Sequence, residues 1–437
     1  MKIGWSSCDV TPDRPTALRG QFYVRVSEGV SDPITATALA IEGAAPDGSP
    51  DQAVIVSCDR VSVLEELQQR VRDGIARRLP ELDPLKVFLH ATHTHDAPEV
   101  ADGFYPPQGP EVMTPAEYAE LFAGRVADMI VKAWQIRGPG GISRAFGHAV
   151  VGHNRRAVYM DGTSRMYGKT AVDDFSHIEG HEDHSVDMLF TWDGGGALSG
   201  IVVNVACPSQ VDEHLLTISS DFWHEARVEL RRRYAEGLFV LPQCAPAGDQ
   251  SPHFLLYGEQ ERVMRERRGV TERQEIARRI ARAVEDAYEP AGQAVQTDVP
   301  VRHVVRTVDL PVRLVTDEEL AEARAELKRL DAEEPADERA ASMKWVHQVR
   351  NRGVVERYAS QQTRSSLPIE LHVVRLGDVA IATNPFELFL DFGLRIKARS
   401  RAPQTMLVQL AAGTFGYLPT ERAVRGRSYG AEVASNL

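Results

Sequence analysis

The sequence is poor in cysteine, with four in 437 residues, and no two of them form a CxxC pair. So sparse a set excludes a disulfide framework, and any chemistry at these residues would be that of single thiolates. Cys8 and Cys58 are expected to be buried, inert thiols. Cys207 stands apart because of its sequence context.

The sequence also lacks a long apolar run and an excess of basic charge. No stretch approaches the roughly 18 consecutive apolar residues of a membrane helix, and residues 1–15 do not read as a signal peptide. We therefore expect a cytoplasmic protein without membrane insertion. Lys and Arg number 50 against 62 Asp and Glu, a net charge of -12, which argues against nucleic-acid binding. A small-molecule substrate fits better, and the oligomeric state stays open, a homo-oligomer included.

What the sequence does contain is the composition of a folded protein, with 43% hydrophobic and 26% charged residues. Short apolar runs alternate with longer amphipathic stretches, and no internal repeat is present. This order predicts an α/β fold with mixed β-sheets flanked by helices. The expected strands are 53–59, 86–93, 198–207, 237–244 and 372–383. The expected helices are 63–78, 115–135, 221–235 and 272–288.

Two stretches bear on domain organisation. Residues 316–352 are highly charged and predict two helices broken at Pro335, which we interpret as a helical insertion. Residues 290–300 are the most linker-like part of the chain. Because candidate site residues lie on both sides of them, we treat residues 1–437 as one catalytic domain.

The segment HATHTH, residues 90–95, is the first candidate site. If it is a strand running into a loop, His93 and His95 share a face, because side chains alternate along a strand. Asp96 and Pro98 would then end the strand at a sheet edge. Two imidazoles placed so can supply a metal ligand and a neighbouring proton acceptor. Alone, the pair is better explained as hydrogen-bonded side chains of a loop.

Further fragments place reactive side chains at the ends of apolar runs. In VNVACPSQ, Cys207 ends a strand and could ligate zinc as a thiolate. In CAPAGDQSPH, Gly248 would permit close backbone approach, and Ser251 would stand at the mouth of the sheet. In NPFELFLDFG, Glu387 follows a strand directly. GTFGYLPTERAVRGRSYG, near the end of the chain, carries two tyrosines.

Together and in this order, these fragments resemble the catalytic domain of the neutral, non-lysosomal ceramidases, from residue 1 to about 430. THTH followed closely by proline is the most specific, and AGDQSP is next. The resemblance implies one Zn²⁺ ion with four ligands: His93, Cys207, Glu387 and Tyr417. It also implies four residues around the reacting carbonyl: His95, Arg155 of HNRR, Ser251 and Tyr429.

The sequence departs from that family in two respects. Cys207 stands where the family usually has histidine, which adds negative charge and makes the metal a weaker Lewis acid, so water activation would depend more on a neighbouring base. The sequence contains neither the family's long C-terminal domain nor a basic amphipathic helix suited to a lipid surface. We therefore expect a soluble substrate rather than ceramide.

The predicted function is zinc-dependent hydrolysis of an amide or related acyl bond, with His95 accepting a proton from water and Arg155 and Tyr429 stabilising the oxyanion. Whether Ser251 is a nucleophile or only orients the substrate stays open. One alternative is a non-catalytic metal-binding or ligand-sensing protein, since a closed four-ligand site behaves structurally. Another makes Cys207 a metal-free nucleophile, which leaves Glu387 without a role.

Overall fold

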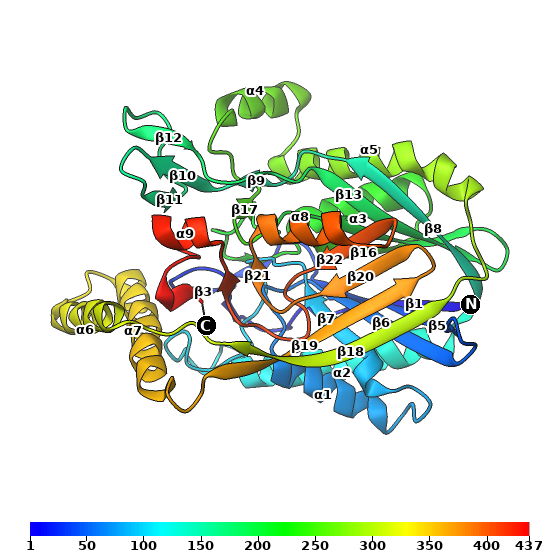
Figure 1. The fold of residues 1–437 in the computed structure, drawn as a ribbon, viewed down its shortest axis with the longest axis horizontal. Coiled ribbons are helices and arrows are strands. Elements are labelled where there is room, and N and C mark those ends of the chain that lie inside the picture. The colour runs from blue at the N-terminus through cyan, green and yellow to red at the C-terminus, as the bar shows by residue number, and fades with distance from the viewer. Residues whose placement is uncertain (437) are drawn as a thin grey trace.

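The computed structural model describes residues 1–436, and an eight-stranded sheet forms its centre (Figure 1). The strand order is β16-β14-β13-β8-β1-β5-β6-β7. The bounds are β1 Lys2–Asp9, β5 Thr35–Ala44, β6 Pro50–Cys58, β7 Val87–Ala91, β8 Gly138–His148, β13 Ser185–Asp193, β14 Leu198–Val205 and β16 Phe239–Cys244. The pairs β6–β7 and β14–β16 are parallel and the other neighbours antiparallel, so the sheet is mixed.

One face of this sheet is covered by four helices: α1 (Glu65–Ala76), α2 (Pro115–Gln135), α3 (Phe222–Arg233) and α5 (Glu272–Gln293). The start of α2 is encoded locally. Thr114 and Glu117 form a capping box, and Pro115 occupies the first turn, where its missing N–H costs nothing. The apolar side of α2, including Phe122 and Trp134, packs into the same core as alternate residues of the sheet.

A second, four-stranded sheet covers the other face, in the order β18-β19-β20-β22. Its strands are β18 Val301–Pro311, β19 Ser366–Leu376, β20 Val379–Thr383 and β22 Gln404–Val408. Phe88 points into the core between the two sheets, whereas its neighbour Leu89 points into the helix-side core. This alternation explains why β7 is apolar on both faces. The fold is thus α/β with mixed sheets and flanking helices, as predicted.

The remaining elements are short or peripheral. They are β2 (Ala17–Leu18), β3 (Arg25–Val26), β4 (Gly29–Val30), η1 (Pro84–Lys86), β9 (His153–Asn154), β10 (Arg156–Tyr159), β11 (Ser164–Met166), β12 (Phe175–Ile178), β15 (Thr217–Ile218), β17 (Gln250–Ser251), α4 (Gly258–Arg268), β21 (Glu387–Leu388), α8 (Leu390–Arg399), β23 (Tyr417–Leu418), α9 (Glu421–Gly426) and η2 (Val433–Ser435). No helix within residues 1–436 has the length and apolar character needed to cross a bilayer.

Three expected elements differ from those in the structure. The strand expected over 86–93 ends at Ala91, before the two histidines of interest. The strand expected over 372–383 is two strands, β19 and β20, joined by a turn in which Gly377 has a φ of +59°. The stretch 290–300 is not wholly a linker, because α5 continues through Pro290 to Gln293.

The charged stretch forms the two expected helices, α6 (Asp317–Ala332) and α7 (Glu338–Ser360), which break around Pro335. They lie beside the C-terminal end of the chain (Figure 1, yellow to orange). Arg350 forms an ion pair of 2.6 Å with Glu432, and Arg357 donates to the Val433 carbonyl. These contacts fix α7 against the segment that carries the late tyrosines.

Candidate functional site

The candidate site lies where strands of both sheets end. In β7, β14, β16, β20 and β22 the chain runs into the loops that carry the predicted residues. Backbone hydrogen bonds from Ala91 to Leu410 and from Ala412 to Leu89 join the end of β7 to the segment after β22. The carboxyl ends of parallel strands are a common place for ligand sites in α/β folds. Here they bring together segments that are distant in sequence.

His93 and His95 converge, but through a turn and not through strand alternation. His93 has a φ of +67°, a left-handed conformation that is uncommon for a residue with a side chain. The ring Nε2 atoms of the two histidines lie 3.4 Å apart. His93 Nδ1 lies 2.7 Å from the Val61 carbonyl oxygen. Burial lowers the pKa of His93 to about 4, so its imidazole is neutral at pH 7.

His95 is held by Glu213, a residue that the sequence analysis did not predict. The His95 Nδ1 lies 2.8 Å from Glu213 Oε2, a close ionic contact rather than a well-aligned hydrogen bond. The other carboxylate oxygen lies 3.5 Å from His253 Nε2. Burial opposes ionisation of Glu213, but the two histidines outweigh it and hold the pKa of this carboxyl well below its usual range. No sequence signal separates Glu213 from other acidic residues of its loop.

A glycine makes room for this arrangement. Gly20 has a φ of +127°, and a Cβ built on it would lie 2.4 Å from His95 Cγ. Any larger residue at this position would therefore displace the His95 ring.

Glu387 and Tyr417 are brought together by a two-stranded pairing. β21 and β23 run parallel, and Glu387 is the register partner of Tyr417. Glu387 Oε2 lies 3.5 Å from His93 Nε2. Burial and the Glu387 carboxylate raise the pKa of Tyr417 well above its usual range, so the phenol keeps its proton. Gly248 permits the close backbone approach expected of it, because a Cβ there would lie 2.3 Å from the Glu387 carbonyl oxygen.

Arg155 and Tyr429 border the same group. The buried Arg155 donates from Nη2 to the Gly248 carbonyl at 2.9 Å and to the Tyr417 hydroxyl at 3.2 Å. The Tyr417 and Tyr429 rings meet edge to face with centroids 5.3 Å apart. Arg155 thus places a charge directly beside the Tyr417 phenol.

Ser251 is fully buried, and its oxygen receives hydrogen bonds. Tyr167 lies at 2.9 Å, the His253 backbone N–H at 3.1 Å and the Gln210 amide at 3.4 Å. Neither a carboxylate nor an imidazole is among the hydrogen-bond partners of Ser251 in residues 1–436. These contacts give Ser251 no base to activate it.

Cys207 does not join the other predicted ligands. It is fully buried in the apolar core beneath α3 and α5, and its sulfur lies 3.4 Å from the Pro208 carbonyl oxygen and 3.7 Å from that of Val151. Burial raises the pKa of this thiol well above its usual range, which disfavours the thiolate that binds zinc. The expected position of Cys207 among the ligands therefore needs correction: it follows β14 as predicted, but faces the protein interior.

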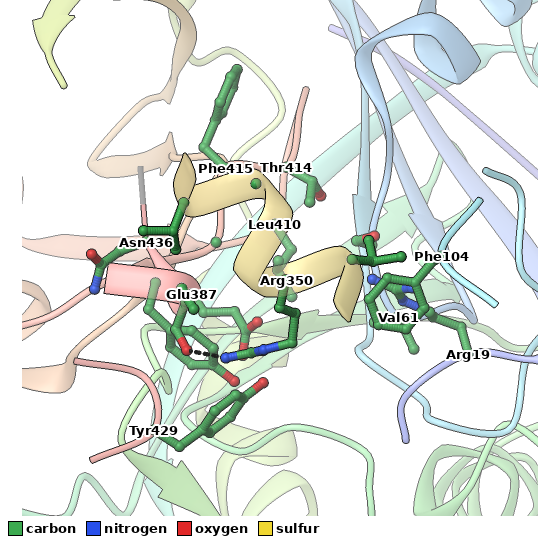
Figure 2. A pocket seen from close by; sticks show the side chains of 18 of the residues that line it. Arg19, Val61, Phe104, Arg350, Glu387, Leu410, Thr414, Phe415, Tyr429 and Asn436 are labelled. Atoms are coloured by element: carbon green, nitrogen blue, oxygen red, sulfur yellow. Dashed lines mark hydrogen bonds between the residues drawn. The ribbon is translucent and has the colours of Figure 1, made fainter. Parts of the chain in front are cut away.

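A cavity of about 360 Å³ adjoins the group (Figure 2). Four of the predicted residues line it, namely His93, Glu387, Tyr417 and Tyr429, whereas the other four do not. One wall is α7, from which Arg350 reaches toward the side where Glu387 and Tyr429 lie. The guanidinium of Arg350 lies 5.3 Å from the Tyr429 ring centroid. Helix α7 of the charged hairpin is therefore part of the pocket.

The donor atoms suit a zinc ion in kind. Imidazole nitrogen, carboxylate oxygen and a phenol are present, and the separations of 3.4 Å and 3.5 Å from His93 Nε2 resemble the edge of about 3.3–3.4 Å implied by bonds of 2.0–2.1 Å in a tetrahedral site. Within residues 1–436, however, no three His, Cys, Asp or Glu side chains already form a ready-made metal site. Closing the group around an ion would require the Tyr417 oxygen and small side-chain movements.

Comparison with solved structures identifies the architecture. A crystal structure of neutral ceramidase from Pseudomonas aeruginosa matches 99% of this chain and 70% of its own, with a TM-score of 0.68 and 16% sequence identity. The chain has the neutral ceramidase fold. A structure described as ceramidase complexed with C2 matches 100% of this chain and 72% of its own, with a TM-score of 0.69 and 15% identity. No protein-family model and no curated protein matches the sequence.

Proposed function

We propose that the chain is a zinc-dependent hydrolase that cleaves an amide or related acyl bond in a soluble small molecule. The observation that carries this proposal is the convergence of His93, Glu387 and Tyr417 at the wall of one cavity, with Arg155 and Tyr429 beside them. The shared fold supports the reaction class, because the two structural relatives are ceramidases.

The residues themselves account for most of the chemistry. When bound, zinc supplies Lewis-acid polarisation of a carbonyl and lowers the pKa of water. Arg155 and Tyr429 donate to the oxyanion as its charge develops. Since Arg155 is already fixed by two hydrogen bonds, it needs little reorganisation during the reaction. Ser251 orients the substrate or the Tyr167 hydroxyl rather than attacking, because its contacts include no base. The proposed reaction is the same whether His95 accepts a proton or binds zinc.

The cavity favours a compact, polar substrate. Its volume of about 360 Å³ lies near the lower end for small-molecule sites. Arg19, Arg350 and Arg357 contribute to its lining, and α7 limits its extent. A substrate with an anionic or strongly hydrogen-bonding group beside the scissile bond suits such a wall better than a long acyl chain does.

A hydrolysis panel tests the proposal. Purified full chain is assayed on short-chain N-acyl amides and esters in buffer and on long-chain ceramide in detergent, each with and without a chelator. We expect chelator-sensitive turnover of soluble substrates and little release of long-chain fatty acid. Efficient ceramide hydrolysis would overturn the substrate class. Metal binding without turnover of any substrate would favour a ligand-sensing protein on the same fold.

A further inference from the structure

We propose that this chain replaces the missing metal ligand with His95, so that His93, His95 and Glu387, together with the Tyr417 phenol, hold the ion and Cys207 takes no part. The inference rests on the proposed function for the presence of a metal, and it concerns which residues bind it.

The outer nitrogen of each imidazole, Nδ1, faces an oxygen atom. His93 Nδ1 faces the Val61 carbonyl at 2.7 Å, and a carbonyl only accepts hydrogen bonds. His95 Nδ1 lies 2.8 Å from the Glu213 carboxylate, where a lone pair would face an anion. Nδ1 of each ring therefore carries a hydrogen, and Nε2 is the atom of each ring that remains available to a metal ion.

This arrangement brings the two Nε2 atoms and the Glu387 carboxylate close together. The two Nε2 atoms face each other across 3.4 Å, and the Glu387 carboxylate lies 3.5 Å from that of His93. Three electron-rich atoms in such proximity repel one another unless a cation or a proton lies between them. A divalent ion satisfies all of them at once, whereas one proton satisfies only a pair.

Each ring also has an oxygen partner at Nδ1, on the side opposite Nε2. Metal-bound histidines commonly donate their second N–H to a carboxylate or a backbone carbonyl, which fixes the ring orientation. His93 has the carbonyl form of this support through Val61, and the Glu213 carboxylate lies 2.8 Å from His95 Nδ1, close enough to support the second ring. Gly20 leaves the space that the His95 ring needs in this position.

Cys207 has the opposite surroundings. Its sulfur lies near the main-chain carbonyl oxygens of Val151 and Pro208, and its side chain belongs to the buried apolar core beneath α3 and α5. Bringing it to the metal would require exposing a buried thiol and removing its proton. The neighbouring imidazole already occupies the required place, so the structure assigns the vacant ligand role to His95. His95 would then not be the free proton acceptor expected from the sequence.

Metal content of variants provides the test. Full-length wild type and the variants His93→Ala, His95→Ala, Cys207→Ser and Glu213→Gln are loaded with zinc, dialysed and measured for bound metal and affinity. The exposed His214→Ala serves as the matched control. We expect His93→Ala and His95→Ala to lose the ion, and Cys207→Ser and His214→Ala to keep it. Glu213→Gln should bind about 10- to 100-fold more weakly, because it loses the charged support of His95.

A spectroscopic measurement guards against variants that fold poorly. Cobalt-substituted wild type should show a visible spectrum without a sulfur-to-cobalt charge-transfer band. Such a band, or full metal retention by His95→Ala, would overturn the inference while leaving a zinc hydrolase intact. A wild-type chain that binds no zinc or cobalt would overturn both. Stoichiometric metal with the expected variant pattern but no turnover on the substrate panel would overturn the proposed function alone.

Discussion

Two groups in this molecule are built from the same residue types, two histidines and a glutamate, and they differ in what surrounds them. The structural group is His303, His372 and Glu370, between the two sheets. His303 Nε2 lies 2.9 Å from His372 Nδ1, and His372 Nε2 lies 2.9 Å from Glu370 Oε1. This series of contacts ends at Arg72, which donates to Glu370 at 2.7 Å and 3.0 Å. His303 Nδ1 lies 3.1 Å from the Gln52 carbonyl oxygen, so one proton between the two rings completes an unbroken chain of hydrogen bonds.

The site group is His93, His95 and Glu387. His93 Nδ1 faces the Val61 carbonyl and His95 Nδ1 lies close to the Glu213 carboxylate, and the two Nε2 atoms face each other beside a cavity that His93 and Glu387 line. Identical residue types thus lie enclosed between two sheets in one place and beside a cavity in the other. Access to a cavity, more than residue identity, separates the structural group from the functional one.

The largest expected effect is on the site group. His93→Ala should reduce turnover by on the order of 1,000-fold or more, because a metal ion supplies several kcal/mol of transition-state stabilisation. Its free energy of unfolding in metal-free buffer should change little compared with the exposed His148→Ala control. Turnover and urea unfolding measured on the same preparations check both statements. If His93→Ala lost stability but kept its turnover rate per folded molecule, the site group would be structural rather than functional.

The structural group should respond in the opposite way. Arg72→Ala removes the cation that pairs with Glu370 and two hydrogen bonds to the Val87 carbonyl. Breaking a buried pair from one side costs about 3–5 kcal/mol, so urea unfolding should show a loss of this size with bound metal unchanged. Arg70→Ala, on the exposed face of the same helix, is the matched control. Equal losses in the two variants would contradict the assigned role.

The sequence predicted the parts of the site that depend on local order along the chain. Apolar runs located the strand ends, and the fragments THTH, AGDQSP and NPFE placed His93, Gly248 and Glu387 at them. Three features could not be predicted from a single sequence. The left-handed turn at His93 has no local signature, because no glycine marks it. The Glu213 contact spans loops far apart in the chain, and the rotamer of Cys207 depends on core packing.

The helical hairpin shows the same limit. Charge and the break at Pro335 predicted α6 and α7, but their amphipathic pattern contained no sign that α7 walls the cavity. That role arises from tertiary contacts such as Arg350 with Glu432. Patterning locates an element, whereas its neighbours determine what it does.

A smaller effect is expected at the oxyanion side of the site group. Tyr429→Phe should lower kcat by about 100- to 1,000-fold, as the loss of one well-placed donor does. KM and bound metal should stay near wild type, because the phenol is not a proposed ligand. The exposed Tyr257→Phe is the control. Loss of metal in Tyr429→Phe would show that Tyr429 is a metal ligand rather than a donor to the oxyanion.

The last expected effect concerns acid, and it is measured on His303 of the structural group. Burial lowers the pKa of His303 to about 3, against about 6.5 in an unfolded chain. A histidine whose folded pKa is depressed contributes stability above its unfolded pKa and loses it as pH falls toward the folded value. The contribution is therefore present at pH 7 and declines between about pH 6.5 and pH 3, at about 1.4 kcal/mol per pH unit for one fully shifted group. Urea unfolding of metal-free protein from pH 7 to pH 4 should show this decline, and His303→Gln should make it shallower, whereas the exposed His148→Ala should not. If the slope of the free energy of unfolding against pH were unchanged in His303→Gln, groups other than His303 would be responsible for the loss of stability in acid.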